Sequence, residues 1–258
     1  MSSRPFRLLV AGGVILLAGI VAFLATVNRT ELAGTTAAPT APAVASLAVP
    51  SVTASLDDWA RAQLSRTVTI EALTGNAVGL GTGWLIDTRG DFVTNAHVIR
   101  GQQTVRIRAR DGSSHLGDVV GVDGALDVAV VRSLDGFAGV PLQPLAAALT
   151  SFPRQVVVLA SSRATGHGDI TDESATAIQP DVPVTGDGAA GHPAATADYH
   201  DMLVLGGNTI YPGNSGGPVL DGDGRVVGIL TLESRSTSKA YAIQLSTVLA
   251  ELIAFAAR

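Results

Sequence analysis

Gly213-Asn214-Ser215-Gly216-Gly217-Pro218-Val219 is the stretch from which the fold and the chemistry of this chain are inferred first. Glycine and proline are typical of turns, and glycine also lets another group approach the main chain closely. A serine inside such a turn presents its hydroxyl together with neighbouring backbone N–H groups. An acyl-transfer site needs both, as nucleophile and as donors to a developing oxyanion. The stretch alone is equally compatible with a glycine-rich hairpin turn that has no chemical role.

Two upstream stretches contain the other groups that a serine nucleophile requires, Thr94-Asn95-Ala96-His97-Val98 and Leu126-Asp127-Val128-Ala129-Val130. A serine hydroxyl is a poor nucleophile at neutral pH and needs a base that titrates near pH 7, which histidine supplies. Asp127 stands directly before an apolar strand, where a carboxylate would be partly buried and would need a partner such as a histidine N–H. Asp118 and Asp123 are alternatives for this carboxylate, although Asp123 precedes a glycine and fits a turn better.

Together the three stretches resemble those of the trypsin-like serine proteases, in the bacterial HtrA/DegP-type branch. That family has its histidine in a T-x-A-H-V stretch, its aspartate at the start of an apolar strand and its nucleophile in G-N-S-G-G-P, in the same order along the chain. The resemblance covers roughly residues 60–250. It implies a catalytic triad of His97, Asp127 and Ser215, and an oxyanion hole formed by the backbone N–H groups of Gly213 and Ser215.

The resemblance also implies an all-β fold, with two six-stranded antiparallel β-barrels of the trypsin-like kind and a C-terminal helix. Segments rich in β-forming residues and separated by turns fit this fold, at residues 67–73, 104–109, 116–122 and 128–132. We place the protease domain at residues 55–258, with a first lobe at about 60–145 and a second at about 150–258. An amphipathic helix is expected at residues 248–256.

Residues 8–27 contain no charged side chain and follow Arg4 and Arg7. At about 1.5 Å per residue, a helix of this length spans roughly the 30 Å hydrocarbon core of a bilayer. The segment predicts one N-terminal transmembrane helix within residues 1–28, which places the rest of the chain outside the cytoplasm. The alternative is a cleaved signal peptide, which would leave a secreted protein. Residues 29–54 are rich in Ala, Thr and Pro and predict a semi-extended linker.

The composition excludes several classes of function. The net charge is −5 and no basic run is present, so no nucleic-acid partner is expected. The absence of cysteine excludes a disulfide framework and a thiolate metal site, and for a trypsin-like chain it favours a bacterial source. A dinucleotide fingerprint would need a helix after residues 79–83, where a strand-like segment follows. The histidines have no compact metal-binding spacing, so we expect neither a cofactor nor a metal.

Substrate preference is inferred from the resemblance. In trypsin-like folds the base of the specificity pocket lies about six residues before the nucleophile, which is Thr209 here, and the later walls would be Thr231, Leu232 and Glu233. Because Thr209 is not acidic, we expect a small or apolar residue at the cleavage site rather than Lys or Arg. Residues 182–198 predict an exposed loop, which is either a switch of the active site or disordered.

These expectations combine into a membrane-anchored, extracytoplasmic serine endopeptidase that hydrolyses protein or peptide substrates through an acyl-enzyme. One alternative is a non-catalytic, membrane-tethered binding or sensor domain whose triad is misaligned. Another is a protease that cuts mainly its own linker. Only 43 residues follow Ser215, and the second lobe needs them, so we expect no PDZ domain after it. The sequence leaves the oligomeric state open.

Overall fold

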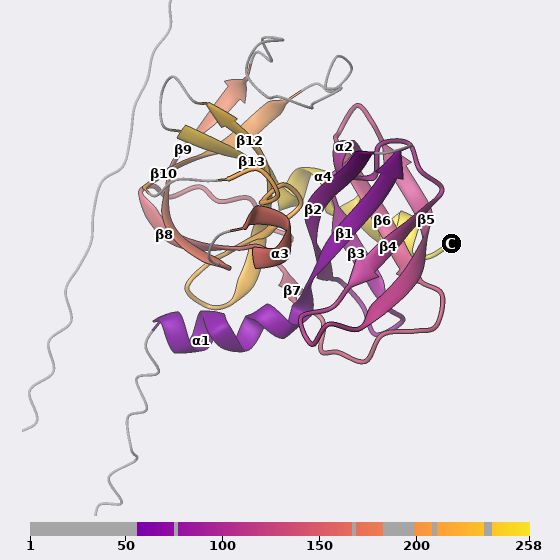
Figure 1. The fold of residues 1–258 in the computed structure, drawn as a ribbon. Coiled ribbons are helices and arrows are strands. Elements are labelled where there is room, and N and C mark those ends of the chain that lie inside the picture. Colours follow the sequence, from indigo (N-terminus) through magenta and orange to yellow (C-terminus); the bar gives the residue numbers. More distant parts are fainter. Residues whose placement is uncertain (1–55, 75–76, 167–168, 183–198, 208–210, 235–238) are drawn as a thin grey trace, which may run out of the picture. The chain divides into compact units, whose positions relative to one another are not determined.

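The computed structural model describes residues 56–258 except for 75–76, 167–168, 183–198, 208–210 and 235–238. The predicted transmembrane helix and linker therefore lie outside the described residues, as does most of the predicted loop at 182–198. Among the helices that are described, none has both the length and the apolar character needed to span a membrane. The described part of the chain consists of two β-barrels and four α-helices, with one short 3₁₀ helix (Figure 1).

The first barrel is closed and has six antiparallel strands in the order β1-β2-β3-β6-β5-β4. Its strands are β1 (Thr67–Thr74), β2 (Ala77–Leu85), β3 (Asp91–Thr94), β4 (Thr104–Arg108), β5 (Ser114–Asp123) and β6 (Val128–Ser133). Branched and aromatic side chains such as Ile70, Phe92 and Ile107 are fully buried inside it. These residues suit a pleated, half-buried surface, which is why the segments form strands.

The second barrel also has six antiparallel strands, because a pairing between β11 and β12 closes the order β11-β8-β9-β10-β13-β12. A short strand, β7, adds to β12 in parallel. The strands are β7 (Gln143–Pro144), β8 (Arg154–Leu159), β9 (Ile170–Asp181), β10 (His200–Gly207), β11 (Pro218–Leu220), β12 (Arg225–Ser234) and β13 (Lys239–Gln244). The predicted pair of six-stranded antiparallel barrels is thus confirmed.

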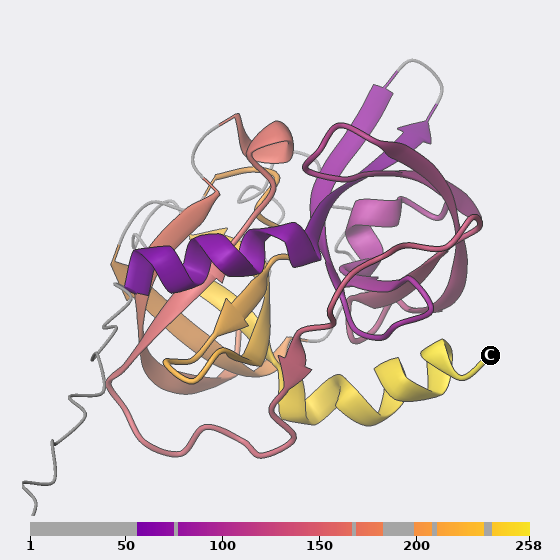
Figure 2. The same cartoon turned by 90° about the horizontal axis from the view of Figure 1, so that it is seen from below.

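The helices are α1 (Leu56–Gln63), η1 (Leu64–Arg66), α2 (Ala96–Ile99), α3 (Ser162–Thr165) and α4 (Leu245–Ala256). The expected C-terminal helix is present and begins three residues earlier than the pattern indicated, at Leu245. It contacts β12 and β13 of the second barrel and β5 and β6 of the first (Figure 2). At Gly121 of β5 the absence of a side chain makes room for the Phe255 ring. The helix therefore links the two barrels.

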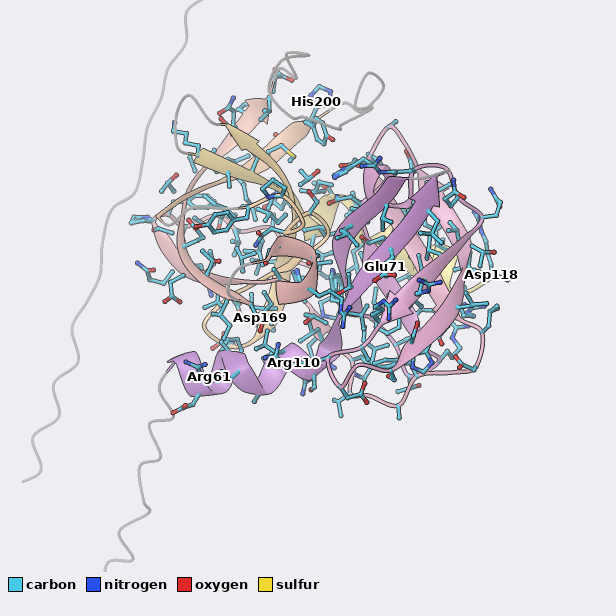
Figure 3. The ribbon with its side chains drawn as sticks, viewed as in Figure 1. Arg61, Glu71, Arg110, Asp118, Asp169 and His200 are labelled. Atoms are coloured by element: carbon cyan, nitrogen blue, oxygen red, sulfur yellow. The ribbon has the colours of Figure 1, made fainter. Side chains whose placement is uncertain are left out.

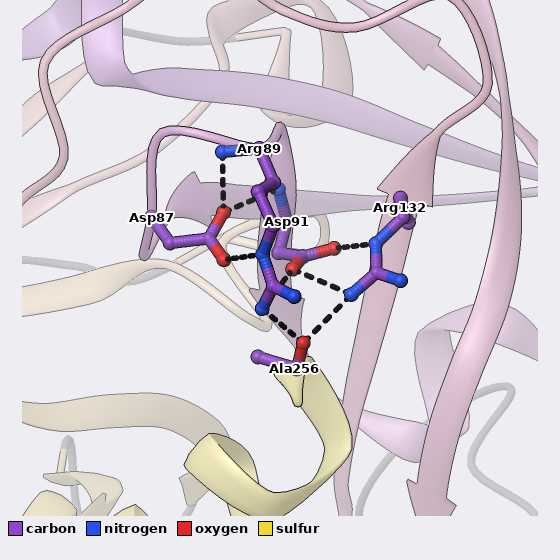
Figure 4. A network of polar contacts seen from close by, with 5 residues as sticks. All are labelled: Asp87, Arg89, Asp91, Arg132 and Ala256. Carbon is purple, nitrogen blue, oxygen red and sulfur yellow. Dashed lines mark hydrogen bonds and ion pairs between the residues drawn. The ribbon is translucent and has the colours of Figure 1, made fainter. Parts of the chain in front are cut away.

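An ion-pair cluster fastens the end of α4 to the first barrel (Figure 4). Asp91 is fully buried, and Arg132 donates to its two carboxylate oxygens at 2.7 and 2.9 Å. Arg132 also donates to the carbonyl oxygen of Ala256 at 2.7 Å, and Arg89 donates to the same oxygen. The Ala256 carbonyl lies in the last turn of α4, where the helix itself provides no donor for it. Side chains of the first barrel provide the donors instead.

One apolar cluster spans the two barrels, in addition to a separate cluster inside each barrel. A single cluster of buried side chains includes Trp84 and Val130 from the first barrel together with Leu159, Met202 and Ile229 from the second. Each such side chain contributes about 1.5–3 kcal/mol when it leaves water. The barrels are therefore held against each other by the same force that holds each of them together, and residues at their boundary have defined positions.

Candidate active site

The turn that contains Ser215 lies between β10 and β11 and is held by backbone hydrogen bonds. The N–H of Thr82 in β2 donates to the Ser215 carbonyl oxygen at 2.8 Å, and the N–H of Gly216 donates to the Leu230 carbonyl oxygen at 2.9 Å. The first bond joins the turn to the first barrel and the second joins it to β12. The buried Asn214 side chain accepts a hydrogen bond from the Tyr211 N–H at 3.0 Å, which shapes the turn from within.

Two glycines in this turn are required by its geometry. Gly213 and Gly216 have φ values of +99° and +85°, a region that is unfavourable for residues with a Cβ. A Cβ at Gly213 would also collide with the carbonyl oxygen of Ala164 in α3. A Cβ at Gly216 would collide with the carbonyl oxygen of Thr82. The glycine-rich sequence therefore reflects both backbone conformation and close packing against α3 and β2.

The amides of this turn differ in their hydrogen bonding. The N–H groups of Asn214, Gly216 and Gly217 donate to backbone carbonyl oxygens at 3.0, 2.9 and 2.8 Å. In the part of the chain that the structure describes, the N–H groups of Gly213 and Ser215 have no acceptor. These two free donors are the ones that the resemblance assigns to an oxyanion hole.

The structure brings His97 and Asp127 into direct contact. His97 lies in α2, the short helix after β3, and its Nδ1 atom is 2.9 and 3.0 Å from the two carboxylate oxygens of Asp127. The His97 backbone N–H donates to the same carboxylate at 3.0 Å. Asp127 has a φ of +54°, and the Asn95 side chain donates to its carbonyl oxygen at 2.9 Å, which supports this unfavourable backbone conformation.

Asp127 is buried, with 2% of the residue exposed, and its carboxylate has two further donors. The Thr231 hydroxyl donates to it at 2.6 Å and the Tyr199 hydroxyl at 2.9 Å. Burial acts to raise the pKa of Asp127, but the hydrogen bond and the charge of His97, helped by Thr231, outweigh burial and hold the pKa below its usual value. Burial, together with the nearby Asp127 charge, raises the pKa of Tyr199, so its hydroxyl stays protonated and acts as a donor.

Thr231 contacts both Ser215 and Asp127. The Ser215 hydroxyl oxygen lies 3.4 Å from the Thr231 backbone carbonyl oxygen, while the Thr231 side chain binds Asp127. The second barrel thus supplies Ser215, Thr231 and Tyr199, and the first barrel supplies His97 and Asp127.

The alternative carboxylates have other roles. Asp123 accepts hydrogen bonds from the N–H groups of Ala125 and Leu126 at 2.8 and 2.9 Å, as a turn residue does. Asp118 accepts one from the Thr104 hydroxyl at 3.1 Å. Among the described residues, no three His, Cys, Asp or Glu side chains are grouped in a way that could hold a metal ion.

The predicted specificity pocket is described only in part. Thr209 lies outside the described residues, and Leu232 and Glu233 have a described backbone in β12 but no described side chain. The Thr231 side chain is buried and directed at Asp127, a contact that the sequence did not indicate. The same is true of Tyr199, which is 72 residues from Asp127 along the chain. No local pattern marks either residue, because each meets Asp127 only through the packing of one barrel on the other.

The sequence of this chain is similar to those of known proteases. The family model for a trypsin-like peptidase domain matches residues 81–229. The putative serine protease HhoA of Synechocystis sp. is 34% identical over 169 residues, which are 64% of this chain and 40% of that protein. Protease Do-like 1, chloroplastic, of Arabidopsis thaliana is 30% identical over 156 residues, 59% of this chain and 33% of that protein. The chain thus matches well under half the length of these relatives.

Solved structures are also similar. The active form of the Rv3671c protease from M. tuberculosis has a TM-score of 0.60 and 26% sequence identity, and the match covers 75% of this chain and 82% of that one. The inactive form of the same protease has a TM-score of 0.56 and 25% identity. The two-barrel architecture is therefore shared with proteases of known structure.

Proposed function

The chain belongs to the trypsin-like peptidase domain family, and from this we propose that it is a serine endopeptidase of the HtrA type. The observation that carries the proposal is the buried Asp127 carboxylate, which is bound to His97 Nδ1 at 2.9 Å and to the hydroxyl of Thr231, a residue whose backbone carbonyl oxygen lies 3.4 Å from the Ser215 hydroxyl. Buried carboxylates that orient a histidine beside a serine serve acyl transfer in several unrelated folds.

In the proposed mechanism Ser215 is the nucleophile, His97 the general base and Asp127 the group that orients the base. The pKa of Asp127 is held low, so its carboxylate accepts and His97 Nδ1 carries the proton that it donates. The other ring nitrogen, Nε2, is then the one that takes the Ser215 proton and later gives it to the leaving amine. Asp127 also stabilises the imidazolium that forms between these steps.

The oxyanion of the tetrahedral intermediate is proposed to bind to the N–H groups of Gly213 and Ser215. Both are without an acceptor in the described part of the chain, so they are available to a substrate. Donors that are already in position need no reorganisation during the reaction, and losing one typically lowers turnover on the order of 10²–10³-fold. Collapse of this intermediate breaks the peptide C–N bond, releases the amine protonated by His97 and leaves an acyl-enzyme on Ser215, which water then hydrolyses.

A fluorophosphonate probe tests the proposal, because it labels only a serine that an adjacent base has activated. We expect labelling of the full chain and its loss in Ser215→Ala and in His97→Ala. His115→Ala is the matched control, since His115 is paired with Asp135 on the surface at 2.8 Å. An unlabelled wild type, under every condition in which the chain is folded, would instead favour the non-catalytic binding or sensor domain.

The cleavage-site preference is proposed to be small or apolar, because the position expected at the base of the pocket is Thr209, which has no charge. A panel of peptides that differ only at the residue before the scissile bond measures this as kcat/KM. Faster cleavage after Lys or Arg than after Ala or Val would reject the assignment of Thr209.

We further propose that residues 8–27 anchor the protein in a membrane, with the protease domain outside the cytoplasm. The support is the uncharged run and the arginines before it. Extraction of membranes with alkaline carbonate should leave the protein in the pellet. Release into the supernatant would indicate a cleaved signal peptide and a secreted enzyme.

A further inference from the structure

A cavity lies where the two barrels meet, and His97, Asp127 and Ser215 are not among its lining residues. Its volume is about 490 Å³, within the range of small-molecule sites, which often occur at such boundaries. The first barrel contributes Thr69, Arg108 and Arg110 to its lining, and the second contributes Ser161, Arg163 and Asp169.

The lining is basic although the protein is acidic. Three arginines face one carboxylate in the cavity, whereas the whole chain has a net charge of −5. Arg110 and Asp169, both labelled in Figure 3, form an ion pair across the boundary at 2.6 Å. Arg108 is paired with Glu71 at 2.5 Å. These pairs hold two of the guanidinium groups in place and leave the cavity with an excess of positive charge.

Arg163 is the arginine that remains. It lies in α3, its side chain is exposed, and no ion pair joins it to any other residue in the described part of the chain. A guanidinium group presents several N–H donors in a planar fork that matches carboxylate and phosphate oxygens. Arg163 is therefore free to bind such a group without breaking an existing pair.

Hydroxyl groups complete the polar lining. The side chains of Thr69 and Ser161 are hydrogen-bonded to each other across the boundary between the barrels. A hydroxyl can rotate to donate to a new acceptor, so each can serve an anion that enters the cavity. The Ser161 N–H donates to the Thr82 hydroxyl at 2.9 Å, and this hydroxyl in turn donates to the Gly213 carbonyl oxygen at 2.9 Å. The wall of the cavity is thus fixed to the turn that contains Ser215.

We propose that this cavity binds a small molecule through a phosphate or carboxylate group. Arg163 supplies the unpaired charge, Arg110 a second guanidinium group, and Thr69 and Ser161 neutral donors. Since all of these groups but Arg163 are held by contacts that join the barrels, little reorganisation is needed when the anion enters.

Isothermal titration calorimetry of the full chain with inorganic pyrophosphate and, separately, with citrate tests the proposal without depending on peptidase activity. We expect saturable binding of at least one probe at a single site, weakening as salt is added because the contacts are charged. Saturation by only one probe would identify the anionic group as phosphate or carboxylate. If neither probe binds saturably at millimolar concentration, the proposal is wrong.

Arg163→Gln and Arg258→Gln locate the site, because each removes one exposed arginine and leaves the buried core intact. Loss of a charge-assisted hydrogen bond in Arg163→Gln should weaken binding by about tenfold. Arg258→Gln, at the end of the chain after α4, should bind like the wild type. Equal affinity in the two variants would place the bound anion elsewhere and overturn the assignment. The rise of Tm in saturating probe, which should be smaller for Arg163→Gln only, is an independent measurement.

Discussion

Asp127 is the residue on which the candidate active site depends, because donors from both barrels converge on its carboxylate. His97 binds it through the side chain and the main chain, and the hydroxyls of Thr231 and Tyr199 bind it from the other side. A buried carboxylate without these partners would be strongly destabilised. The same bonds restrict the orientation of the carboxylate and, with it, the ring of His97.

Tyr199→Phe tests whether this orientation matters for the reaction. The variant keeps the ring and removes one hydrogen bond to Asp127, worth about 1 kcal/mol, so kcat/KM should fall by roughly fivefold. Tyr241→Phe is the matched control, because Tyr241 is also a buried tyrosine but lies in β13. A loss in kcat with KM unchanged is expected for a positioning residue. Equal kinetics for both variants would show that Tyr199 has only a structural role.

A comparison of Gly213→Ala with Gly112→Ala separates the effect of backbone strain at positive φ from the effect of steric crowding around the new methyl group. Gly213 has a φ of +99° and lies against the Ala164 carbonyl oxygen, so a methyl group there should displace the N–H proposed for the oxyanion and lower kcat on the order of 10²–10³-fold. Gly112→Ala is the control, because Gly112 has a similar φ of +92° but open space around it. Both variants should lose some stability, measured by urea denaturation. Only Gly213→Ala should lose activity.

At the scale of elements, α4 and β6 are joined by Arg132, which bonds both Asp91 and the carbonyl oxygen of Ala256. Burial acts to raise the pKa of Asp91, more strongly than the hydrogen bonds from Arg132 lower it. Asp91 therefore depends on its arginine neighbours to remain charged inside the protein at neutral pH. Arg132 supplies two hydrogen bonds, and the half-exposed Arg89 forms an ion pair with Asp91 at 3.2 Å.

Arg132→Gln should therefore be strongly destabilising, by about 3 kcal/mol at pH 7, because the fully buried Asp91 carboxylate loses its bidentate partner and keeps only the half-exposed Arg89, 3.2 Å away. Arg106→Gln is the comparison: Arg106 is partly exposed, its partner Glu71 keeps Arg108, and the expected loss is about 1 kcal/mol or less. The free energy of unfolding from urea titrations gives both values. Similar losses in the two variants would contradict the role given to Asp91 burial.

At the scale of the whole molecule, the apolar cluster that spans both barrels joins them into one unit. Residues from both barrels build the candidate active site, and residues from both also line the basic cavity. Neither site exists in one barrel alone. Their geometry therefore depends on the apolar boundary and on α4, which packs on both sides of it.

Leu252→Ala tests this coupling, because Leu252 is fully buried in the shared core. The free energy of unfolding of this variant should fall by about 2–5 kcal/mol. In Ile253→Ala, at a neighbouring position that is 55% exposed, it should change little. Tryptophan fluorescence and fluorophosphonate labelling of Ser215 should report the same urea midpoint, because both barrels unfold in a single transition. Separate midpoints would mean that the barrels unfold independently.

Much of this protein follows from local information in the chain. Glycines next to Ser215 indicate a tight turn because few other residues adopt positive φ, and alternating β-branched residues indicate strands because they fit a pleated surface. The confirmed strands of the first barrel lie close to the predicted ranges for this reason. The second barrel is harder to predict, because β9 (Ile170–Asp181) lies in a polar, partly exposed segment where the alternation of apolar and polar residues is weak.

Other features exist only once the barrels are packed together. Thr231 is 104 residues from Asp127 along the chain, and Tyr199 is 72 residues from it. At such separations no pattern in the sequence indicates that the side chains are in contact. The same holds for Arg163, which reaches a cavity shared with β1 and β4 although α3 belongs to the second barrel. Backbone preferences act between neighbours in sequence, whereas the burial of apolar surface decides which distant side chains meet. The partners of Asp127 and the basic cavity are therefore products of tertiary packing.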